Sequence, residues 1–256
     1  FREAAVLAER GLHVAMLSHG SDLRNPERHA ARFEWSPYRD RDWEEVGRLQ
    51  RQADDLAAHL RSWGGPIFVS TPDLLDDMPT GVWLPVVVDP ARWEAATPVM
   101  ERERPIAVHA PSKDRIKGSD YVDAALGVLH DRGMLEYRRI ERVPSAEMPA
   151  VYRHADIVLD QFRIGSYGVA ACEAMASGRV VVGNVTEAVR TRVRESTGRE
   201  LPIVQAAPSE IADVVERLLT DREGVREVAM MSREFARAVH VGRFSADVLR
   251  PFLLGA

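Results

Sequence analysis

The second half of the sequence alternates short apolar runs with longer segments of helical periodicity. This alternation constrains the fold more than any other feature, because strands joined by helices of this length pair in parallel. The runs that predict buried strands are residues 106–109, 135–140, 156–160, 180–182 and 201–204. The segments that predict helices are residues 119–132, 145–154, 168–177, 187–195 and 209–219. The predicted fold class is therefore α/β, with a doubly wound parallel sheet of the Rossmann-like kind.

The first part of the sequence predicts a smaller α/β unit. Strands are expected at 12–18, 66–70 and 83–88, and a long amphipathic helix at 42–62. Residues 89–104, polar and rich in proline and glutamate, predict a linker. The expected domains are residues 1–88 and, after the linker, residues 105–235. A C-terminal helix is expected at 236–256, and it could return to the first domain. The chain opens at Phe1 inside a helix-like stretch, so we expect the N-terminal domain to be incomplete.

Composition and charge exclude several classes of function. The chain of 256 residues is 45% hydrophobic and 29% charged, which is ordinary for a protein with a buried core. Its formal net charge of −5 argues against a nucleic-acid-binding protein. No apolar run is long enough to span a bilayer, although peripheral membrane contact stays open. The single cysteine, Cys172, excludes an intramolecular disulfide and a cysteine metal cage, and it favours a cytoplasmic location.

The loop after the strand at 106–109 holds the only lysines of the chain, Lys113 and Lys117. Together with Arg115, and with Gly118 beside the start of the next helix, they predict an anion site at a helix N-terminus. Lysine and arginine differ at a phosphate, where one is a compact charge and the other a planar fork. The alternative is a solvated basic loop whose charge is balanced by neighbouring aspartates.

A glycine-containing segment, residues 165–178, follows the strand at 156–160. Gly165 and Gly168 allow the backbone to approach a ligand closely, and Gly168 stands at the start of a predicted helix. Within this helix, Glu173 is flanked by alanines and a methionine. A carboxylate in such apolar surroundings is costly unless it is paired or accepts hydrogen bonds. Ribose hydroxyls would satisfy it, and so would a salt bridge to Arg179 or another arginine; the pattern leaves both open.

Several motifs, in matching order over nearly the whole chain, resemble those of the family 4 (group 1) retaining glycosyltransferases of the GT-B fold. Residues 173–182 resemble their E-A-M-A-x-G-x-P-V-V signature, and residues 117–118 resemble their K-G donor-phosphate loop. Residues 155–157 and 167–169 resemble the A-D pair and the F-G turn, whose amides face the diphosphate in that family. The other resemblances are 83–89 to the I-P-N-G-V-D hinge, and 17–19 to a strand end that carries an active-site histidine.

The resemblance implies a retaining transfer of a sugar from a nucleotide diphosphate sugar to an acceptor. Residues 1–88 would be part of the acceptor-side domain, and residues 105–235 would bind the nucleotide sugar. The sequence does not name the acceptor, so a glycan, a lipid and a small natural product all stay open, and no nucleic-acid partner is expected. No convincing D-x-D motif follows a strand, so we expect no metal and no cofactor, with cationic side chains at the diphosphate instead.

The resemblance also implies roles for individual residues, with His19, Lys117 and Glu173 as the catalytic set. Lys117, with Lys113 or Arg115, would hold the diphosphate. Glu173 would hold the ribose, and His19 would contact the donor sugar or the acceptor. The full donor-binding set expected is Lys113, Arg115, Lys117, Gly118, Arg142, Val143, Gly165, Tyr167, Gly168, Val169 and Glu173.

Backbone groups complete the expected donor site. The amides of Gly168 and Val169 would face the phosphates, and the backbone near Arg142 and Val143 would border the base.

The sequence departs from the family pattern most clearly at Gly165, where the family carries a glutamate that reaches the donor sugar. Asp160, Gln161 or Arg163 could reach into the pocket in its place. The departure keeps two alternatives open besides transfer. One is a sugar-nucleotide epimerase of the same fold, and the other is a catalytically degenerate nucleotide-sugar-binding subunit.

Overall fold

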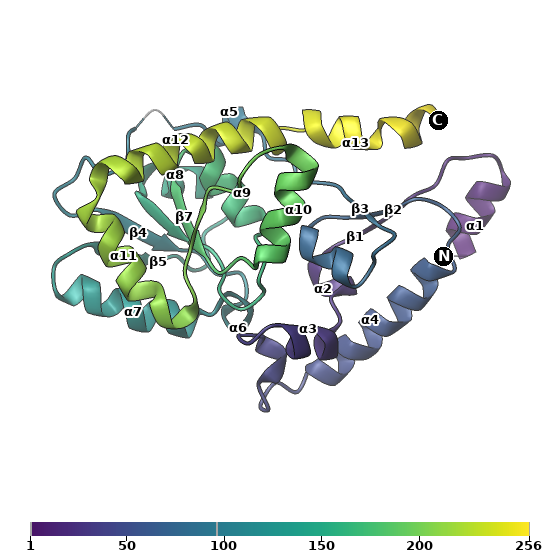
Figure 1. The fold of residues 1–256 in the computed structure, drawn as a ribbon, viewed down its shortest axis with the longest axis horizontal. Helices are drawn as coiled ribbons and strands as arrows, with labels where there is room; N and C mark the ends of the chain where they lie inside the picture. The colour runs from purple at the N-terminus through teal and green to yellow at the C-terminus, as the bar shows by residue number, and fades with distance from the viewer. Residues whose placement is uncertain (1, 96, 256) are drawn as a thin grey trace. The chain divides into compact units, whose positions relative to one another are not determined.

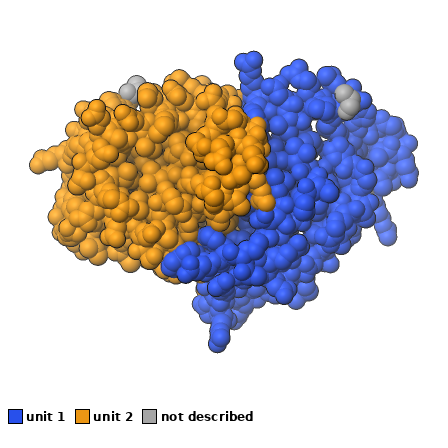
Figure 2. Space-filling view, in the orientation of Figure 1, with its two compact units in different colours: residues 1–86, 242–256 blue, residues 87–241 orange. Residues whose placement is uncertain are grey.

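The computed structural model describes residues 2–95 and 97–255 (Figure 1). The chain splits into two compact units (Figure 2). Unit 1 comprises residues 1–86 and 242–256, and unit 2 comprises residues 87–241. The candidate site described below lies in unit 2.

Unit 2 contains a parallel sheet with the strand order β5-β4-β6-β7-β8. Its strands are β4 (Ile106–His109), β5 (Glu136–Arg139), β6 (Ile157–Leu159), β7 (Val180–Gly183) and β8 (Ile203–Gln205). Each predicted strand of this region is present, with slightly different ends. Strands β4, β6 and β7 are buried along their whole length, as expected for a parallel sheet covered on both faces.

The chain reverses its direction of travel through the sheet at β4. From β4 it moves to β5 on one side, and it then returns to β6 on the other side. In open α/β sheets, ligands bind beyond the carboxyl ends of the strands at such a switch point. The topology therefore directs attention to the loops that follow β4 and β6.

Helices cover the sheet of unit 2, as Figure 1 shows. The longer ones pack in pairs, α7 against α11 and α9 against α12. Buried side chains of one core cluster join the central strands to α7, α11 and α12; they include Leu126, Leu129, Ile157, Val180, Val182, Ile211 and Val225. The helices are α5 (Pro90–Trp93), α6 (Asp114–Lys117), α7 (Ser119–Asp131), α8 (Met148–His154), α9 (Val169–Ala176), α10 (Glu187–Thr197), α11 (Ile211–Thr220) and α12 (Arg222–Val239), with a 3-10 turn at Pro208–Glu210.

The expected linker at 89–104 is part of unit 2 and is partly structured. It contains α5, which Asp89 caps by accepting a hydrogen bond from the Ala91 amide at 3.0 Å. Met100 is fully buried, and its amide donates to the Asp156 carboxylate at 2.6 Å. Proline and glutamate suggested a linker, but the buried residues between them anchor the segment to the core.

The start of α8 also differs from the expectation. The sequence predicted that Ser145 begins a capped helix, whereas α8 begins at Met148 and has no side-chain cap. The Ser145 carbonyl instead accepts a hydrogen bond from the Arg92 guanidinium.

Unit 1 is built around a small parallel sheet with the order β1-β2-β3. Its strands are β1 (Met16–Ser18), β2 (Ile67–Val69) and β3 (Val82–Trp83). Its helices are α1 (Arg2–Glu9), α2 (Gly20–Leu23), α3 (Pro26–Arg32), α4 (Val46–Arg61) and α13 (Arg243–Leu254), with 3-10 turns at Pro37–Arg39 and Pro72–Asp76. A buried cluster joins β2 to α2 and α4 through Leu23, Ala57, Leu60, Ile67, Val69, Leu74 and Met78.

Two strands of unit 1 are shorter than predicted. The strand expected at 83–88 ends at Trp83, although the Leu84 amide still donates to the Val69 carbonyl at 2.9 Å. Pro85 cannot donate a ladder hydrogen bond, so strand pairing does not continue past it. The strand expected at 12–18 begins only at Met16.

The C-terminal helix α13 belongs to unit 1. Ser245 donates a hydrogen bond to the Pro85 carbonyl at 2.9 Å, and the ring of Phe252 lies edge-on to Phe68 at 6.2 Å. Among the described residues, no helix is long and apolar enough to cross a membrane.

Candidate functional site

The loops after β4 and β6 meet at the carboxyl edge of the sheet, because both strands run parallel and are direct neighbours. One connection between the two loops is a backbone hydrogen bond, which the Phe162 amide donates to the Lys117 carbonyl at 3.1 Å. The predicted lysine loop and the predicted glycine segment are thus parts of one place in the fold.

Gly118 fixes the geometry of the lysine loop. It ends α6 and precedes α7 in a left-handed conformation with φ of 73°, which favours glycine. A Cβ atom at this position would lie 3.1 Å from Cγ of Arg163. Gly118 therefore serves both a turn and a close approach between the two loops.

Lys117 points into the protein and pairs with Asp160. Its Nζ lies 2.5 Å from Oδ1 of Asp160, and the two side chains are only 10% and 2% exposed. Asp160 directly follows β6, and its amide donates to the Val182 carbonyl at 3.0 Å. The pair therefore joins the end of α6 to the residue that follows β6.

The N-terminus of α9 faces the same pair. Gly168 is the N-cap residue, and its amide lies 3.4 Å from Oδ2 of Asp160. Val169 opens the helix, and its side chain is half exposed. The Lys117 ammonium and a helix-terminal amide, the donors predicted for a phosphate, therefore converge on one point.

Gly165 adopts a left-handed conformation with φ of 72°. Its carbonyl accepts hydrogen bonds from the amide and the hydroxyl of Thr186, at 2.9 and 3.1 Å. The turn is tightened by Gln161, whose amide donates to the Ser166 carbonyl at 2.6 Å. The left-handed backbone conformation therefore favours glycine at this position, which the sequence motifs did not reveal.

Glu173 lies on α9 and is half buried. Burial raises the pKa of its carboxyl to about 7; Arg92 opposes this rise and Asp160 adds to it. Within residues 2–95 and 97–255, no hydrogen bond or salt bridge to its carboxylate is found. A half-buried carboxylate that has no donor among these residues is suited to a ligand that brings hydroxyls.

The salt bridge between Glu173 and Arg179 that the sequence left open is not formed. Arg179 is fully buried and donates instead to the backbone carbonyls of Ser177, Ala155 and Thr97, at 2.8, 2.9 and 2.6 Å. The arginine stabilises the amino edge of the sheet and takes no part in the candidate site.

The other predicted cations lie at the rim. Lys113 is exposed at the residue before α6, and Arg115 is half exposed within it. Arg142 is exposed after β5 with φ of 57°, and Val143 beside it is half buried. These residues surround the same edge of the sheet, in positions that are accessible to a ligand.

Tyr167 can offer only its backbone to a ligand. Its side chain is 3% exposed, and its hydroxyl lies within hydrogen-bonding distance of Nε2 of His240, at 3.4 Å. Burial raises the pKa of its phenol well above the usual value. The ring therefore belongs to the core beneath the α9 turn.

His19 belongs to unit 1, where it is exposed and directly precedes α2 without a side-chain capping bond. The residue after it, Gly20, lies close to a buried arginine, since a Cβ at Gly20 would lie 3.2 Å from the Arg24 guanidinium. Arg24 in turn pairs with Asp73 at 2.6 Å.

Sequence reasoning gave Asp160 only a general place near the pocket and missed its ion pair with Lys117. The available signal was a carboxylate directly after the apolar run 157–159, where a buried charge needs a partner. Among the described residues, no group of three or more His, Cys, Asp or Glu side chains is arranged to hold a metal ion.

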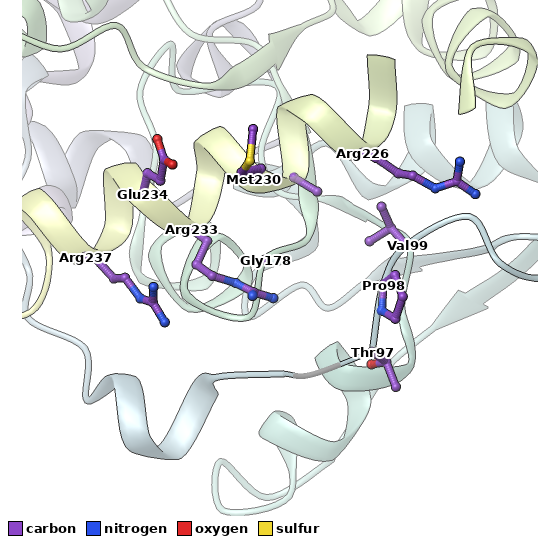
Figure 3. A pocket seen from close by; sticks show the side chains of 10 residues that line it. Thr97, Pro98, Val99, Gly178, Arg226, Met230, Arg233, Glu234 and Arg237 are labelled. Carbon is purple, nitrogen blue, oxygen red and sulfur yellow. The ribbon is translucent and has the colours of Figure 1, made fainter. Parts of the chain in front are cut away.

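A pocket of about 350 Å³ lies elsewhere on unit 2 (Figure 3). Its walls include Val99, which precedes β4, and Gly178, which precedes β7, so it opens at the amino edge of the sheet. Its arginines are engaged with the protein: Arg226 lies 3.1 Å from Glu101, and Arg233 donates to the Ala95 carbonyl at 2.7 Å. This pocket is separate from the Lys117 site.

Residues 92–247 match the model of a protein family described as glycosyl transferase-like. The match covers more than half of the chain and includes the strands of unit 2 and the Lys117, Asp160 and Glu173 positions. No curated protein matches the sequence significantly.

Solved structures share the fold at low sequence identity. Sucrose-phosphate synthase from Thermosynechococcus elongatus aligns with a TM-score of 0.61 and 13% identity, over 98% of this chain and 76% of that one. HepE of Anabaena, in complex with UDP-glucose, aligns with a TM-score of 0.61 and 12% identity, over 94% and 72%. A glycosyltransferase from Rickettsia africae gives 0.57 and 11%, over 98% and 79%. These likenesses confirm the predicted GT-B fold.

Proposed function

The chain belongs to the glycosyl transferase-like family, and we propose that it transfers a sugar from a nucleotide diphosphate sugar to an acceptor, with retention at the anomeric carbon and without a divalent metal. The observation that carries the choice of donor is the convergence of Lys117 and the α9 N-terminus at the switch point of the sheet. Ammonium groups and helix-terminal amides are the donors that proteins use for phosphate.

The proposed catalytic effect is stabilisation of the leaving group. Negative charge grows on the nucleotide diphosphate as the glycosidic bond breaks, and fixed donors aimed at that charge lower the barrier. Lys117 at the end of α6, and the amides of Gly168 and Val169 at the N-terminus of α9, would supply these donors. Lys113 and Arg115 would add positive charge from the rim.

Glu173 would bind the ribose. Two ribose hydroxyls can donate to one carboxylate, and hydrogen bonds to the ionised form lower its pKa. This would reverse the effect of burial, which raises the Glu173 pKa to about 7. The base would then lie near Arg142 and Val143, which follow β5 at the same edge.

The function is tested by a thermal-shift screen of nucleoside diphosphates and nucleotide sugars, followed by a transfer assay with the donors that bind. UDP-glucose is a natural first donor, since HepE was solved in complex with it. A ligand that binds only the native state raises the melting temperature in proportion to the logarithm of its concentration. Absence of any shift across the nucleotide set would contradict the proposal.

Gly165 supports a second candidate, a nucleotide-sugar-binding subunit without turnover. As a glycine, it has no side chain at the position that the resembling family uses for the donor sugar. A shift with nucleotide sugars but no transfer to glycan, lipid or small-molecule acceptors would favour this candidate. Release of an epimerised free nucleotide sugar without an acceptor would instead indicate an epimerase.

A further inference from the structure

The donors that we assign to the diphosphate are already engaged by a carboxylate of the same chain. Oδ1 of Asp160 lies 2.5 Å from the Lys117 ammonium, and Oδ2 lies 3.4 Å from the Gly168 amide. One carboxylate thus contacts both kinds of donor that would hold a phosphate. Its two oxygens and its negative charge resemble one edge of a phosphate group.

The site cannot serve both anions in full. The Gly168 amide has a single hydrogen, and a phosphate beside the 2%-exposed Asp160 carboxylate would face a like charge with little screening from water. The charge of Asp160 already influences its surroundings, since it contributes to the raised pKa values of Tyr152, Cys172 and Glu173. Binding of a diphosphate must therefore overcome Asp160 or displace it.

Asp156, at the other end of β6, shows what a structural aspartate looks like in this fold. Its carboxylate accepts the backbone amides of Met100 and Ile106 at 2.6 and 2.8 Å, and so joins two segments of the core. Among the described residues, the Asp160 carboxylate accepts only one backbone amide, that of Gly168, the N-cap residue of α9. Its other contact is the Lys117 ammonium.

We propose that Asp160 is an internal competing anion, which holds Lys117 and the Gly168 amide in the ligand-free site and yields them to a bound diphosphate. The inference rests on the proposed function for the identity of the ligand. It adds Asp160 as the residue that sets how tightly the site retains a diphosphate, which in a transfer reaction is also the leaving product. A site without this competitor would bind the product more strongly and release it more slowly.

The first test compares wild type with Asp160→Asn, using inorganic pyrophosphate as the probe and calorimetry as the measurement. Asparagine keeps the size and one acceptor oxygen but removes the charge. Since one charge-assisted hydrogen bond is freed, we expect pyrophosphate to bind on the order of tenfold more tightly to the variant. Equal or weaker binding by a folded variant, or no binding by either protein, would overturn the inference.

Asp120→Asn is the matched control. Asp120 lies in the first turn of α7 beside the same loop, but it is exposed. The Asp120→Asn variant loses the same charge as Asp160→Asn, but at a solvent-exposed position where water and salt screen that charge strongly. The affinity of this variant for pyrophosphate should therefore stay near that of wild type. A gain equal to that of Asp160→Asn would mean that net charge alone is responsible, and this too would overturn the inference.

A second measurement follows Lys117 directly and needs no ligand. The chain has only two lysines, so mass spectrometry of peptides after acetic anhydride treatment can report Lys117 against the exposed Lys113 as internal reference. In Asp160→Asn the ratio of Lys117 to Lys113 acetylation should rise, because the ammonium loses its partner. An unchanged ratio would show that Asp160 does not hold the lysine. Asp160→Ser serves the same comparison if the asparagine variant does not fold.

Nucleoside diphosphates separate this inference from the proposed function. If the pyrophosphate affinities and the acetylation ratios are as expected but no nucleotide binds, the role of Asp160 as a competing anion is supported and the proposed glycosyl donor is wrong. If nucleotides bind wild type but Asp160→Asn gains no affinity for them, the donor proposal stands and the inference fails.

Discussion

Asp160 and Glu173 are carboxylates at the same edge of the sheet, yet their surroundings differ. Asp160 has an ammonium partner at 2.5 Å. Glu173 has only the electrostatic influence of Arg92 and Lys117 to set against burial and the charge of Asp160, and burial dominates its pKa. The chemistry of each residue is therefore decided by its neighbours and not by its type.

The raised Glu173 pKa predicts a pH dependence of stability. The pKa of the Glu173 carboxyl is about 7 in the folded state and 4.5 in the unfolded state. Its contribution to the free energy of unfolding is therefore fully present below pH 4.5, and it is lost as the pH rises through about 7. Glu173→Gln should therefore melt at a higher temperature than wild type above pH 7, and the two should converge below pH 4.5. Thermal unfolding of ligand-free protein across this range is the measurement. Parallel curves would show that Glu173 is not destabilised by burial.

The same variant should lose affinity for nucleosides, because a neutral amide accepts ribose hydrogen bonds less strongly than a carboxylate. A hydrogen bond to a charged group is worth about 1.5–3 kcal/mol. Calorimetry at pH 8 should show a loss of this order, while the melting temperature rises. Unchanged nucleoside affinity would remove Glu173 from the ribose site.

Lys117→Ala should weaken the binding of nucleoside diphosphates more than that of nucleosides, because the Lys117 ammonium is proposed to contact the phosphates and neither the base nor the ribose. The measurement compares the affinities of a nucleoside and its diphosphate in both proteins. The variant also leaves the Asp160 carboxylate buried without its partner, so some loss of stability is expected. An equal loss of affinity for both ligands would show that the site is distorted as a whole.

At the scale of elements, the turn between β6 and α9 brings the glycine segment to the lysine loop. Gly165 is the residue on which its shape depends, because φ of 72° costs other residues about 1–2 kcal/mol. A glutamate at this position, as the resembling family carries, would also crowd the predicted sugar pocket. The structure adds backbone strain to that effect.

Two substitutions at Gly165 separate backbone strain from crowding. Gly165→Ala should lower the free energy of unfolding by about 1–2 kcal/mol, and Gly165→Asn by less, because asparagine adopts the left-handed conformation more readily. Denaturant unfolding measures both. If the larger asparagine is the more damaging, crowding and not backbone conformation limits the position.

At the scale of the whole molecule, the fold places cations and amides at the switch point of the sheet. Transfer should therefore survive a strong chelator, since the charge of the leaving group would be met by Lys117 and helix amides. The assay is run with and without chelator on the same donor. Loss of transfer that magnesium or manganese restores would show that a metal is required.

The sequence by itself determined the architecture of unit 2, because the alternation of apolar and amphipathic segments is a local pattern. It also located the lysine loop, the Gly168 turn and Glu173, since their residue types and order resemble one family. Elements with weaker local signals were less well predicted. The strand at 83–88 was overextended, and the linker at 89–104 proved to be anchored to the core.

Only the tertiary structure decided which of these residues act together. The crossover from β5 back to β6 sets Asp160 beside Lys117, a contact across 43 positions of sequence. It also directs Arg179 to backbone carbonyls and leaves Glu173 without a salt bridge among the described residues. Partners of buried charges are chosen by packing between distant segments, whereas strands and helices follow from the order of neighbouring residues.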